Sequence, residues 1–278
     1  MLQMGTQSSK SLYPWQGLDI PKLLRSFYLE PKKSLGQSFL ISDHVADNIV
    51  SYAGSGDCVI EIGPGTGMLT ARLASHYNRV IAVELDQRLK PLHDIVKASY
   101  TNVEFVYEDF LKWHPVEASA VVGNLPYYIT TPILEKTFLN IKPKVMVIMV
   151  QKELAQRMVA KPGSKTYGAL SVFVQSFTKP FALFNVKPTC FYPAPKVESS
   201  VLKLEGNYNP DIDAVLLEKL VKKAFQQRRK MLKNVIGEET ILLETAKEAH
   251  IDVSLRPEQI TVEQFNYWAS LLKGQNIV

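Results

Sequence analysis

Cysteine is scarce in this sequence, since its 278 residues contain only Cys58 and Cys190. The two residues lie far apart and outside any Cys-x-x-Cys spacing, so they offer neither a zinc site nor a disulfide framework. We expect both side chains to be buried thiols and the protein to hold no metal.

Long apolar runs are also missing. The first 30 residues contain no stretch that could form a signal-peptide core, because Asp19, Lys22 and Arg25 interrupt the single apolar cluster. No later segment is long enough to span a bilayer. With 46% hydrophobic and 21% charged residues, the composition is close to that of an average globular protein. We therefore expect a cytoplasmic enzyme that makes no membrane contact.

The charge balance shows only a small excess of one sign. The formal net charge is +5 and the sequence pI is about 9.0. Such an excess is weak support for nucleic-acid binding unless the cations cluster. Runs of a few charges are usually solvated faces, and that interpretation stays open beside a nucleic-acid contact. The candidate contact residues are Lys32, Lys33, Arg228, Arg229, Lys230 and Lys233.

The order of apolar patterns indicates an α/β fold. From Asp57 onward, short β-rich runs alternate with helical patterns, which is typical of a parallel sheet covered by helices. Helices are expected over residues 66–76 and 168–178. The runs that predict strands cover residues 58–62, 79–84, 103–107, 119–124, 144–151, 181–187 and 197–204. The sequence therefore predicts a Rossmann-like sheet of seven strands.

Turn-forming residues at 205–210 interrupt this pattern, and strongly helical sequence follows. Near the end of the chain, Thr261 and Gln264 form a capping box for a last helix that ends near Leu272. Before the sheet, residues 20–27 carry the pattern of a short amphipathic helix. The predicted units are an N-terminal extension, a Rossmann-like domain and a small helical domain, over residues 1–30, 31–205 and 206–278.

A glycine-rich loop follows the first predicted strand. Gly63, Gly65 and Gly67 lie between that strand and a helix, where a backbone can approach a ligand closely. A nicotinamide dinucleotide fingerprint would require a glycine where Met68 stands. Glu84 ends the second strand 21 residues after Gly63 and can accept hydrogen bonds from ribose hydroxyls. The pattern fits an adenosine-containing cofactor; a tight turn without a ligand is the alternative.

Two further motifs separate S-adenosylmethionine from a dinucleotide. Asp109 follows the third strand and can accept the adenine amine of the cofactor, or it can simply cap a helix. Asn124, Leu125 and Tyr127 end the fourth strand in the sequence NLPY. An adenine amine is a poor nucleophile, so a catalyst must accept its N–H groups and hold the ring. Asn124 and the Leu125 peptide offer acceptors, and Tyr127 offers a stacking face. An Asx-type turn is the alternative.

These motifs resemble the ribosomal RNA adenine dimethyltransferase family over about residues 20–272. The matching segments are KKSLGQSFL (32–40), EIGPGTGMLT (61–70), VELD (83–86), EDFL (108–111), NLPYYITTP (124–132), VQKELAQRM (150–158), YGALSVFVQ (167–175), FYPAPKVES (191–199) and FQQRRKMLKN (225–234).

The resemblance implies an S-adenosylmethionine-dependent methyltransferase. Its target is the N6 amine of two adjacent adenosines in the 3′-terminal hairpin loop of small-subunit (16S) rRNA. The implied partner is that rRNA in an immature (pre-30S) particle, with a role in ribosome biogenesis, and we expect a monomer. The implied cofactor contacts are Ser38, Leu40, Gly63, Glu84, Asp109 and Asn124, and the implied catalytic residues are Asn124, Leu125, Tyr127 and Phe191.

By the same resemblance, Tyr127 and Phe191 enclose the flipped adenine, although Phe191 also fits a core aromatic. The sequence departs from the family at Ser38 and Tyr128, where asparagine is usual. Ser38 keeps the capacity to donate and accept a hydrogen bond, so we expect a retained contact.

Two other functions remain open at this point. One is the related large-subunit rRNA adenine methyltransferase, which shares the cofactor loop and the NLPY motif. However, the segments VQKELAQRM and FQQRRKMLKN resemble the small-subunit branch. The other is a non-catalytic RNA-binding assembly or transcription factor on the same fold. The intact residues Glu84, Asp109, Asn124, Tyr127 and Phe191 argue against lost catalysis.

Overall fold

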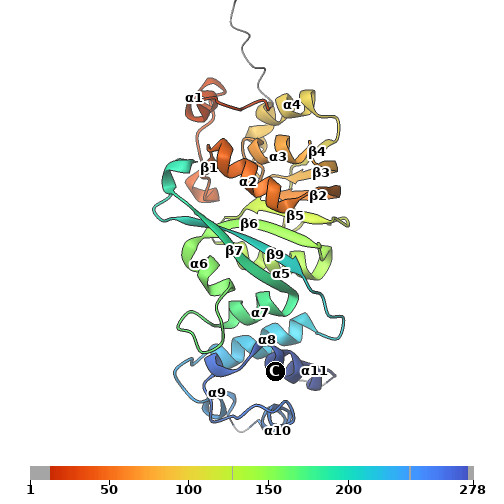
Figure 1. Ribbon diagram of the computed structural model, residues 1–278, viewed down its shortest axis with the longest axis vertical. Helices are drawn as coiled ribbons and strands as arrows, with labels where there is room; N and C mark the ends of the chain where they lie inside the picture. The colour runs from red at the N-terminus through yellow and green to blue at the C-terminus, as the bar shows by residue number, and fades with distance from the viewer. Residues whose placement is uncertain (1–12, 127, 238, 275–278) are drawn as a thin grey trace, which may run out of the picture.

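A mixed seven-stranded sheet crosses the middle of the molecule (Figure 1). The computed structural model describes residues 13–126, 128–237 and 239–274. The strands of the sheet are β2 (Gly56–Ile62), β3 (Tyr77–Val83), β4 (Val103–Val106), β5 (Ala120–Asn124), β6 (Val145–Gln151), β7 (Thr178–Val186) and β9 (Ser199–Gly206). Their order is β4-β3-β2-β5-β6-β9-β7, with β9 antiparallel to both of its neighbours. All seven predicted strands are confirmed.

The apolar runs alternate between two cores, one on each face of the sheet. Val59 and Val122 point into one cluster, whereas Ile60 and Val121 point into the other. This alternation follows from the two-residue period of a strand, and covered parallel strands need apolar residues on both sides. The first face is covered by α2 (Asp43–Ala53), α3 (Met68–Leu73) and α4 (Lys90–Ser99), and the second by α5 (Thr130–Lys136), α6 (Lys152–Met158) and α7 (Ala169–Phe177).

The segment before the sheet packs on the first face. The predicted amphipathic helix is confirmed as α1 (Ile20–Ser26), whose N-cap Asp19 accepts a 2.9 Å hydrogen bond from the Lys22 amide. A short 3₁₀ helix over Lys33–Leu35 follows. Next, β1 (Phe39–Leu40) pairs antiparallel with β8 (Phe191–Tyr192). Two segments that are distant in the sequence therefore meet beside the carboxyl edge of the sheet.

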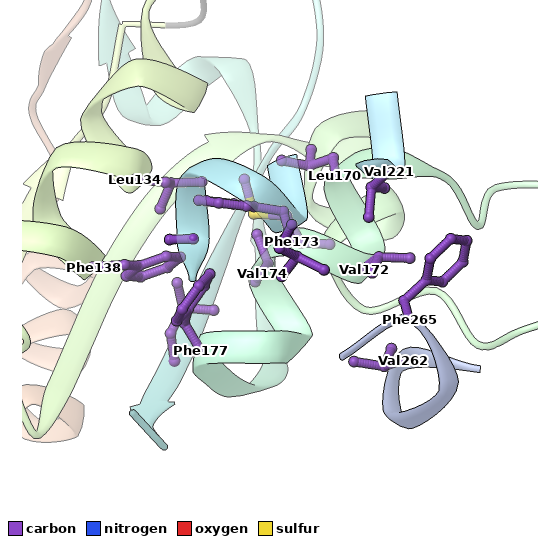
Figure 2. Close-up of a cluster of buried hydrophobic side chains, with 14 of the residues drawn as sticks. Leu134, Phe138, Leu170, Val172, Phe173, Val174, Phe177, Val221, Val262 and Phe265 are labelled. Atoms are coloured by element: carbon purple, nitrogen blue, oxygen red, sulfur yellow. The ribbon is translucent and has the colours of Figure 1, made fainter. Parts of the chain in front are cut away.

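The chain ends in four helices, α8 (Ala214–Phe225), α9 (Leu232–Ile236), α10 (Thr240–Glu248) and α11 (Val262–Leu271). The predicted capping box is confirmed, since the Thr261 hydroxyl accepts from the Gln264 amide at 3.2 Å and the Gln264 side chain accepts from the Thr261 amide at 3.0 Å. Figure 2 shows that side chains of α5, α7, α8 and α11 share one apolar cluster. The divisions at residues 30 and 205 stay predictions, and the helical tail shares its core with the sheet.

Two expectations need correction. Cys58 and Cys190 are partly exposed rather than buried. Burial along β2 begins at Val59, one residue after Cys58, and Cys190 ends a short surface turn. The helix expected over 66–76 is shorter, because Gly67 is the left-handed N-cap of α3. Within the described residues, no helix has the length and apolar content needed to cross a membrane.

Candidate active site

A pocket lies at the carboxyl edge of the sheet between β2 and β5. From β2 the chain continues to β3 and β4 on one side, and it then returns to β5 on the other. Ile62 of β2 pairs with Gly123 of β5. Ligands of open α/β sheets bind at such a switch point. The loops after β2, β3, β4 and β5 line the pocket together with residues 35–40.

The glycine loop has a backbone that only glycine adopts readily. Gly63, Gly65 and Gly67 have φ values of 69°, 58° and 84°. A Cβ at Gly67 would lie 2.9 Å from Val96 Cγ2, so this glycine allows α3 and α4 to pack closely. A Cβ at Gly63 would meet nothing within 4 Å. The backbone of Gly63 therefore faces open space at the pocket, where a ligand can approach it.

Glu84 ties this loop to the end of β3. Its side chain is 7% exposed and lines the pocket. One carboxylate oxygen accepts from the Gly65 amide at 3.1 Å, and the other accepts from the Asp86 amide at 2.8 Å. Burial raises the pKa of Glu84 to about 6, although these main-chain hydrogen bonds lower it. Glu84 is therefore mostly ionised at neutral pH and has oxygen lone pairs left for a ligand.

A second carboxyl group, Glu61, was missed from the sequence. It is 1% exposed, lines the pocket and accepts a 2.5 Å hydrogen bond from the Thr70 hydroxyl. Burial is the main cause that raises the pKa of Glu61 to about 8; the Thr70 hydrogen bond opposes the shift, and the charge of Glu84 adds to it. Glu61 is therefore mostly protonated at neutral pH. A carboxyl residue inside an apolar strand was the signal that could have identified it.

His93 was also missed. Its imidazole is fully buried, with Nε2 2.8 Å from the Gly65 carbonyl and Nδ1 3.0 Å from the Tyr107 hydroxyl. The ring stacks on Phe105 at 4.1 Å between centroids. Burial lowers the pKa of His93 to about 4, so the ring is neutral. The Gly65 carbonyl requires a donor, so Nε2 carries the proton and Nδ1 accepts. Nothing local distinguishes this residue in the sequence.

Asp109 caps a local turn, and its contact with the cofactor stays a prediction. It is partly buried and lines the pocket after β4. Its Oδ1 accepts from the Leu111 amide at 2.9 Å, which caps a turn rather than a helix. Its Oδ2 has no hydrogen bond within the part of the chain that the structure describes. One oxygen thus holds the loop and the other is available to a ligand.

Asn124 reaches across the pocket from the end of β5. Its Nδ2 donates a 3.1 Å hydrogen bond to the main-chain carbonyl of Ser38. The Asx-type turn considered from the sequence is absent, because the residue two positions on is Pro126, which has no N–H. The Leu125 amide donates to Met149 in β6 at 3.0 Å. Among the described residues, nothing donates to Asn124 Oδ1 or to the Leu125 carbonyl, so two acceptors remain side by side.

Of the two aromatic residues predicted to enclose the target base, the structure describes only Phe191. Tyr127 lies outside the described residues. Phe191 is 3% exposed and packs in the first-face core, where it pairs with Leu40 across β1 and β8. This position matches the alternative of a core aromatic, and stacking on a base stays a prediction. Leu40 and Ser38 line the pocket, and the Ser38 hydroxyl donates to the Pro193 carbonyl at 2.7 Å.

The predicted cations form two separate groups. Lys32 Nζ lies 3.7 Å from Asp86, whose carboxylate also pairs with Arg88 at 2.6 Å. Lys33 is exposed. Around α9, which lies well below β1 in Figure 1, Arg229, Lys230 and Lys233 are exposed, while Arg228 donates to the Ser164 carbonyl at 3.2 Å. The structure therefore does not bring the two groups together.

The chain is similar to relatives of known name and to solved structures. A relative from Alkaliphilus oremlandii, named ribosomal RNA small subunit methyltransferase A, is 41% identical over 273 residues, which cover 90% of this chain and 95% of the relative. A relative of the same name from Thermotoga maritima is 42% identical over 244 residues, covering 87% of this chain and 85% of the relative. The crystal structure of a dimethyladenosine transferase from Plasmodium falciparum superimposes with a TM-score of 0.73 at 25% identity, over 83% of this chain and 95% of that one.

The structure of the 23S rRNA methyltransferase ErmE gives a TM-score of 0.66 at 23% identity, over 84% of this chain and 99% of that one, which supports the fold alone. The family model described as ribosomal RNA adenine dimethylase matches residues 29–273. The chain therefore belongs to the ribosomal RNA adenine dimethylase family.

Proposed function

We propose that this protein transfers methyl groups from S-adenosylmethionine to the N6 amines of two adjacent adenosines in small-subunit (16S) rRNA. The target lies in the 3′-terminal hairpin loop, and the product is N6,N6-dimethyladenosine. The observation that carries the proposal is the pair of free acceptors, Asn124 Oδ1 and the Leu125 carbonyl, at the pocket that Glu84 also lines. The family and the names of the relatives support the same activity and target.

The pocket residues fit this cofactor. Gly63 leaves open space beside the backbone, and Glu84 offers a mostly ionised carboxylate to the ribose hydroxyls. Leu85 is 51% exposed and lines the pocket, so it offers apolar contact to the adenine beside the free Asp109 oxygen. Ser38, Leu40 and Asn124 complete the proposed contacts. When bound, the cofactor would supply a methyl group on a positively charged sulfonium, whose sulfur is a good leaving group, so the attacking amine needs no strong base to activate it.

The residues of the chain act on the adenine amine. Its lone pair is delocalised into the ring, so the nitrogen is a poor nucleophile until it becomes more tetrahedral. Asn124 Oδ1 and the Leu125 carbonyl are placed to accept its two N–H groups and to favour that geometry. The adenine must leave its stack to reach them. Tyr127 and Phe191 are the proposed stacking faces.

The partner in this proposal is an immature (pre-30S) particle. The proposed RNA contacts are the cations Lys32, Lys33, Arg228, Arg229, Lys230 and Lys233. Phosphate contacts of this kind position an RNA without reading its sequence. The proposal includes a monomeric enzyme acting in the cytoplasm, with a role in ribosome biogenesis.

The proposal is tested by incubating the protein with labelled S-adenosylmethionine and ribosomal subunits that lack these methyl groups. Small and large subunits are offered separately, and the modified adenosines are then mapped. The expected result is dimethylation of two adjacent adenosines near the 3′ end of the small-subunit rRNA. Methylation confined to large-subunit rRNA would reassign the substrate. Binding to the particle without any methyl transfer would indicate a non-catalytic assembly factor.

A further inference from the structure

Tyr128 is an exposed aromatic residue at the mouth of the pocket. It follows the NLPY motif in the loop between β5 and α5. The side chain is 60% exposed and also lines the pocket. Its hydroxyl makes no hydrogen bond to any residue that the structure describes. Its place in the pocket lining, rather than its exposure alone, puts the ring within reach of a base that enters the pocket.

The ring is supported from below by a second segment of the chain. A Cβ placed on Gly36 would lie 3.5 Å from Tyr128 Cε1, so the ring packs against the Gly36 backbone. Gly36 has a φ of 62° and ends the 3₁₀ helix that Lys33 begins. This backbone conformation favours glycine, and a residue without a side chain leaves room for the ring. Tyr128 is therefore supported on its Gly36 side and open to water elsewhere.

The surroundings of the ring suit nucleic acid. Lys32 and Lys33 precede Gly36 by three to four positions and are exposed. Lys32 forms an ion pair with Asp86, which also pairs with Arg88, whereas Lys33 has no ion-pair partner among the described residues. Aromatic faces beside a cationic backbone contact are how proteins hold single-stranded nucleic acid. Because Tyr128 lines the pocket, a base that reached this ring would be a neighbour of one held in the pocket.

We propose that Tyr128 stacks on the adenine adjacent to the target, so that one base of the pair is held at the mouth while the other reacts. This inference rests on the proposed function. When one adenine leaves the stack, its neighbour loses a stacking face, which the Tyr128 ring replaces. Tyr128 therefore positions the pair of bases, and it favours an unpaired purine at that place.

The test pairs variants of the protein with variants of the RNA. Tyr128→Phe keeps the ring, whereas Tyr128→Leu keeps the apolar contact with Gly36 and removes the ring. Tyr267→Ala, which removes an exposed tyrosine of α11, is the matched control. Small subunits are reconstituted with either the adenosine pair or one adenosine of the pair changed to uridine. Single-turnover methylation of the remaining adenosine is measured against particle concentration.

For the wild type and Tyr128→Phe, we expect the uridine change to raise the half-saturating particle concentration about tenfold. For Tyr128→Leu, the half-saturating concentration is already raised about tenfold, and the uridine change adds little. The cofactor Kd stays unchanged in all variants. A fluorescent 2-aminopurine in place of the adjacent adenine is quenched on binding to the wild type and to Tyr267→Ala, but not to Tyr128→Leu.

The inference would be overturned if the uridine change raised the half-saturating concentration equally for the wild type and for Tyr128→Leu. Equal quenching of 2-aminopurine by these two proteins would overturn it as well. In either case, methylation of the adenosine pair by the wild type would leave the proposed function standing. Absence of any methylation by the wild type would overturn the proposed function and this inference together.

Discussion

The side-chain amide of Asn124 donates a 3.1 Å hydrogen bond to the main-chain carbonyl of Ser38. This bond determines which end of the amide faces the pocket, because Nδ2 is occupied and Oδ1 is left as an acceptor. The acceptor at Ser38 belongs to the backbone, so the serine that replaces the asparagine usual in the family does not disturb it. The Ser38 hydroxyl bonds instead to the Pro193 carbonyl at 2.7 Å, next to β8.

We expect Asn124→Ala to lower single-turnover methyl transfer by about 30-fold, or about 2 kcal/mol, at saturating RNA and cofactor. RNA affinity should change far less, because the acceptor matters most as the nitrogen attacks. The measurement separates unmodified, monomethyl and dimethyl adenosine. Asn78→Ala is the control. The Asn78 side chain lies outside the pocket and donates one exposed hydrogen bond, 3.0 Å long, to Asp57. Near wild-type dimethylation by Asn124→Ala would refute the mechanism.

Cofactor affinity should depend on the protonation of Glu84. Its pKa is raised to about 6, so the carboxylate that accepts ribose hydroxyls is lost as pH falls through 6. We expect affinity to drop about tenfold from pH 7 to pH 5. Glu84→Gln should bind about 1–3 kcal/mol more weakly at pH 7 and lose this pH dependence. Calorimetry at pH 5–7 checks both, with Glu104→Gln as the control. Glu61 titrates near pH 8, above this range. If the cofactor affinity of Glu84→Gln fell with pH as steeply as that of the wild type, Glu84 would not be the group whose protonation weakens cofactor binding.

Acid should destabilise the protein through His93. The folded pKa is about 4 against an ordinary value of 6.5, so the unfolded chain binds the proton more readily. The stability contribution is therefore complete above pH 6.5 and is lost as pH falls toward 4. We expect the wild type to lose about 3 kcal/mol more than His93→Gln over this range. Denaturant unfolding from pH 7 to pH 4 measures the difference. His44→Gln, an exposed histidine of α2, should match the wild type.

Phe191 needs a variant that separates packing from stacking. Because its ring is 3% exposed, Phe191→Ala should cost about 3–5 kcal/mol of folding stability and obscure any catalytic role. Phe191→Leu keeps most of the apolar volume, so we expect about 1 kcal/mol of lost stability. If the ring stacks on the target base, turnover should also fall about tenfold. Phe177→Leu, in the α7 core, is the control for packing alone. Equal turnover in the two variants would leave Phe191 as a core residue only.

The cations near α9 should contribute to RNA binding through phosphates. Neutralising Arg229 and Lys230 together should reduce the slope of log affinity against log salt by about 1–2 and leave cofactor affinity unchanged. Filter binding to small subunits at several salt concentrations measures the slope. The matched pair is Lys90→Gln with Lys97→Gln, two exposed lysines of α4. An unchanged slope in the Arg229 and Lys230 variant would leave the cluster as a solvated face.

Local patterns were sufficient to predict the strands, because each strand repeats an apolar period of two or is buried on both faces. The same holds for the Thr261 capping box, whose partners lie three residues apart. Glu84, Asp109 and Asn124 were predicted to share one site because the carboxyl ends of neighbouring parallel strands meet at one edge. All three residues line one pocket, while their contacts with a cofactor stay predictions.

The features that the sequence did not reveal depend on contacts between distant segments. His93 supports the glycine loop only because α4 places it 2.8 Å from the Gly65 carbonyl. The sequence left a core position for Phe191 as an alternative, and the choice depended on the pairing of β1 with β8, which joins residues about 150 positions apart. The partial exposure of Cys58 reflects its place in β2 just before the fully buried residues begin at Val59. No periodicity in the chain encodes these relationships.

One apolar cluster joins the sheet to α8, α9 and α11, so packed side chains connect the sheet that carries the pocket with the helix that lies beside the cations. An RNA that engages both ends forms its second contact intramolecularly, at a high effective concentration. A short hairpin that carries only the target adenosines can reach the pocket alone and gains no such avidity. Under the proposed function, the molecule selects a folded RNA by the distance between two of its surfaces, before any base is read.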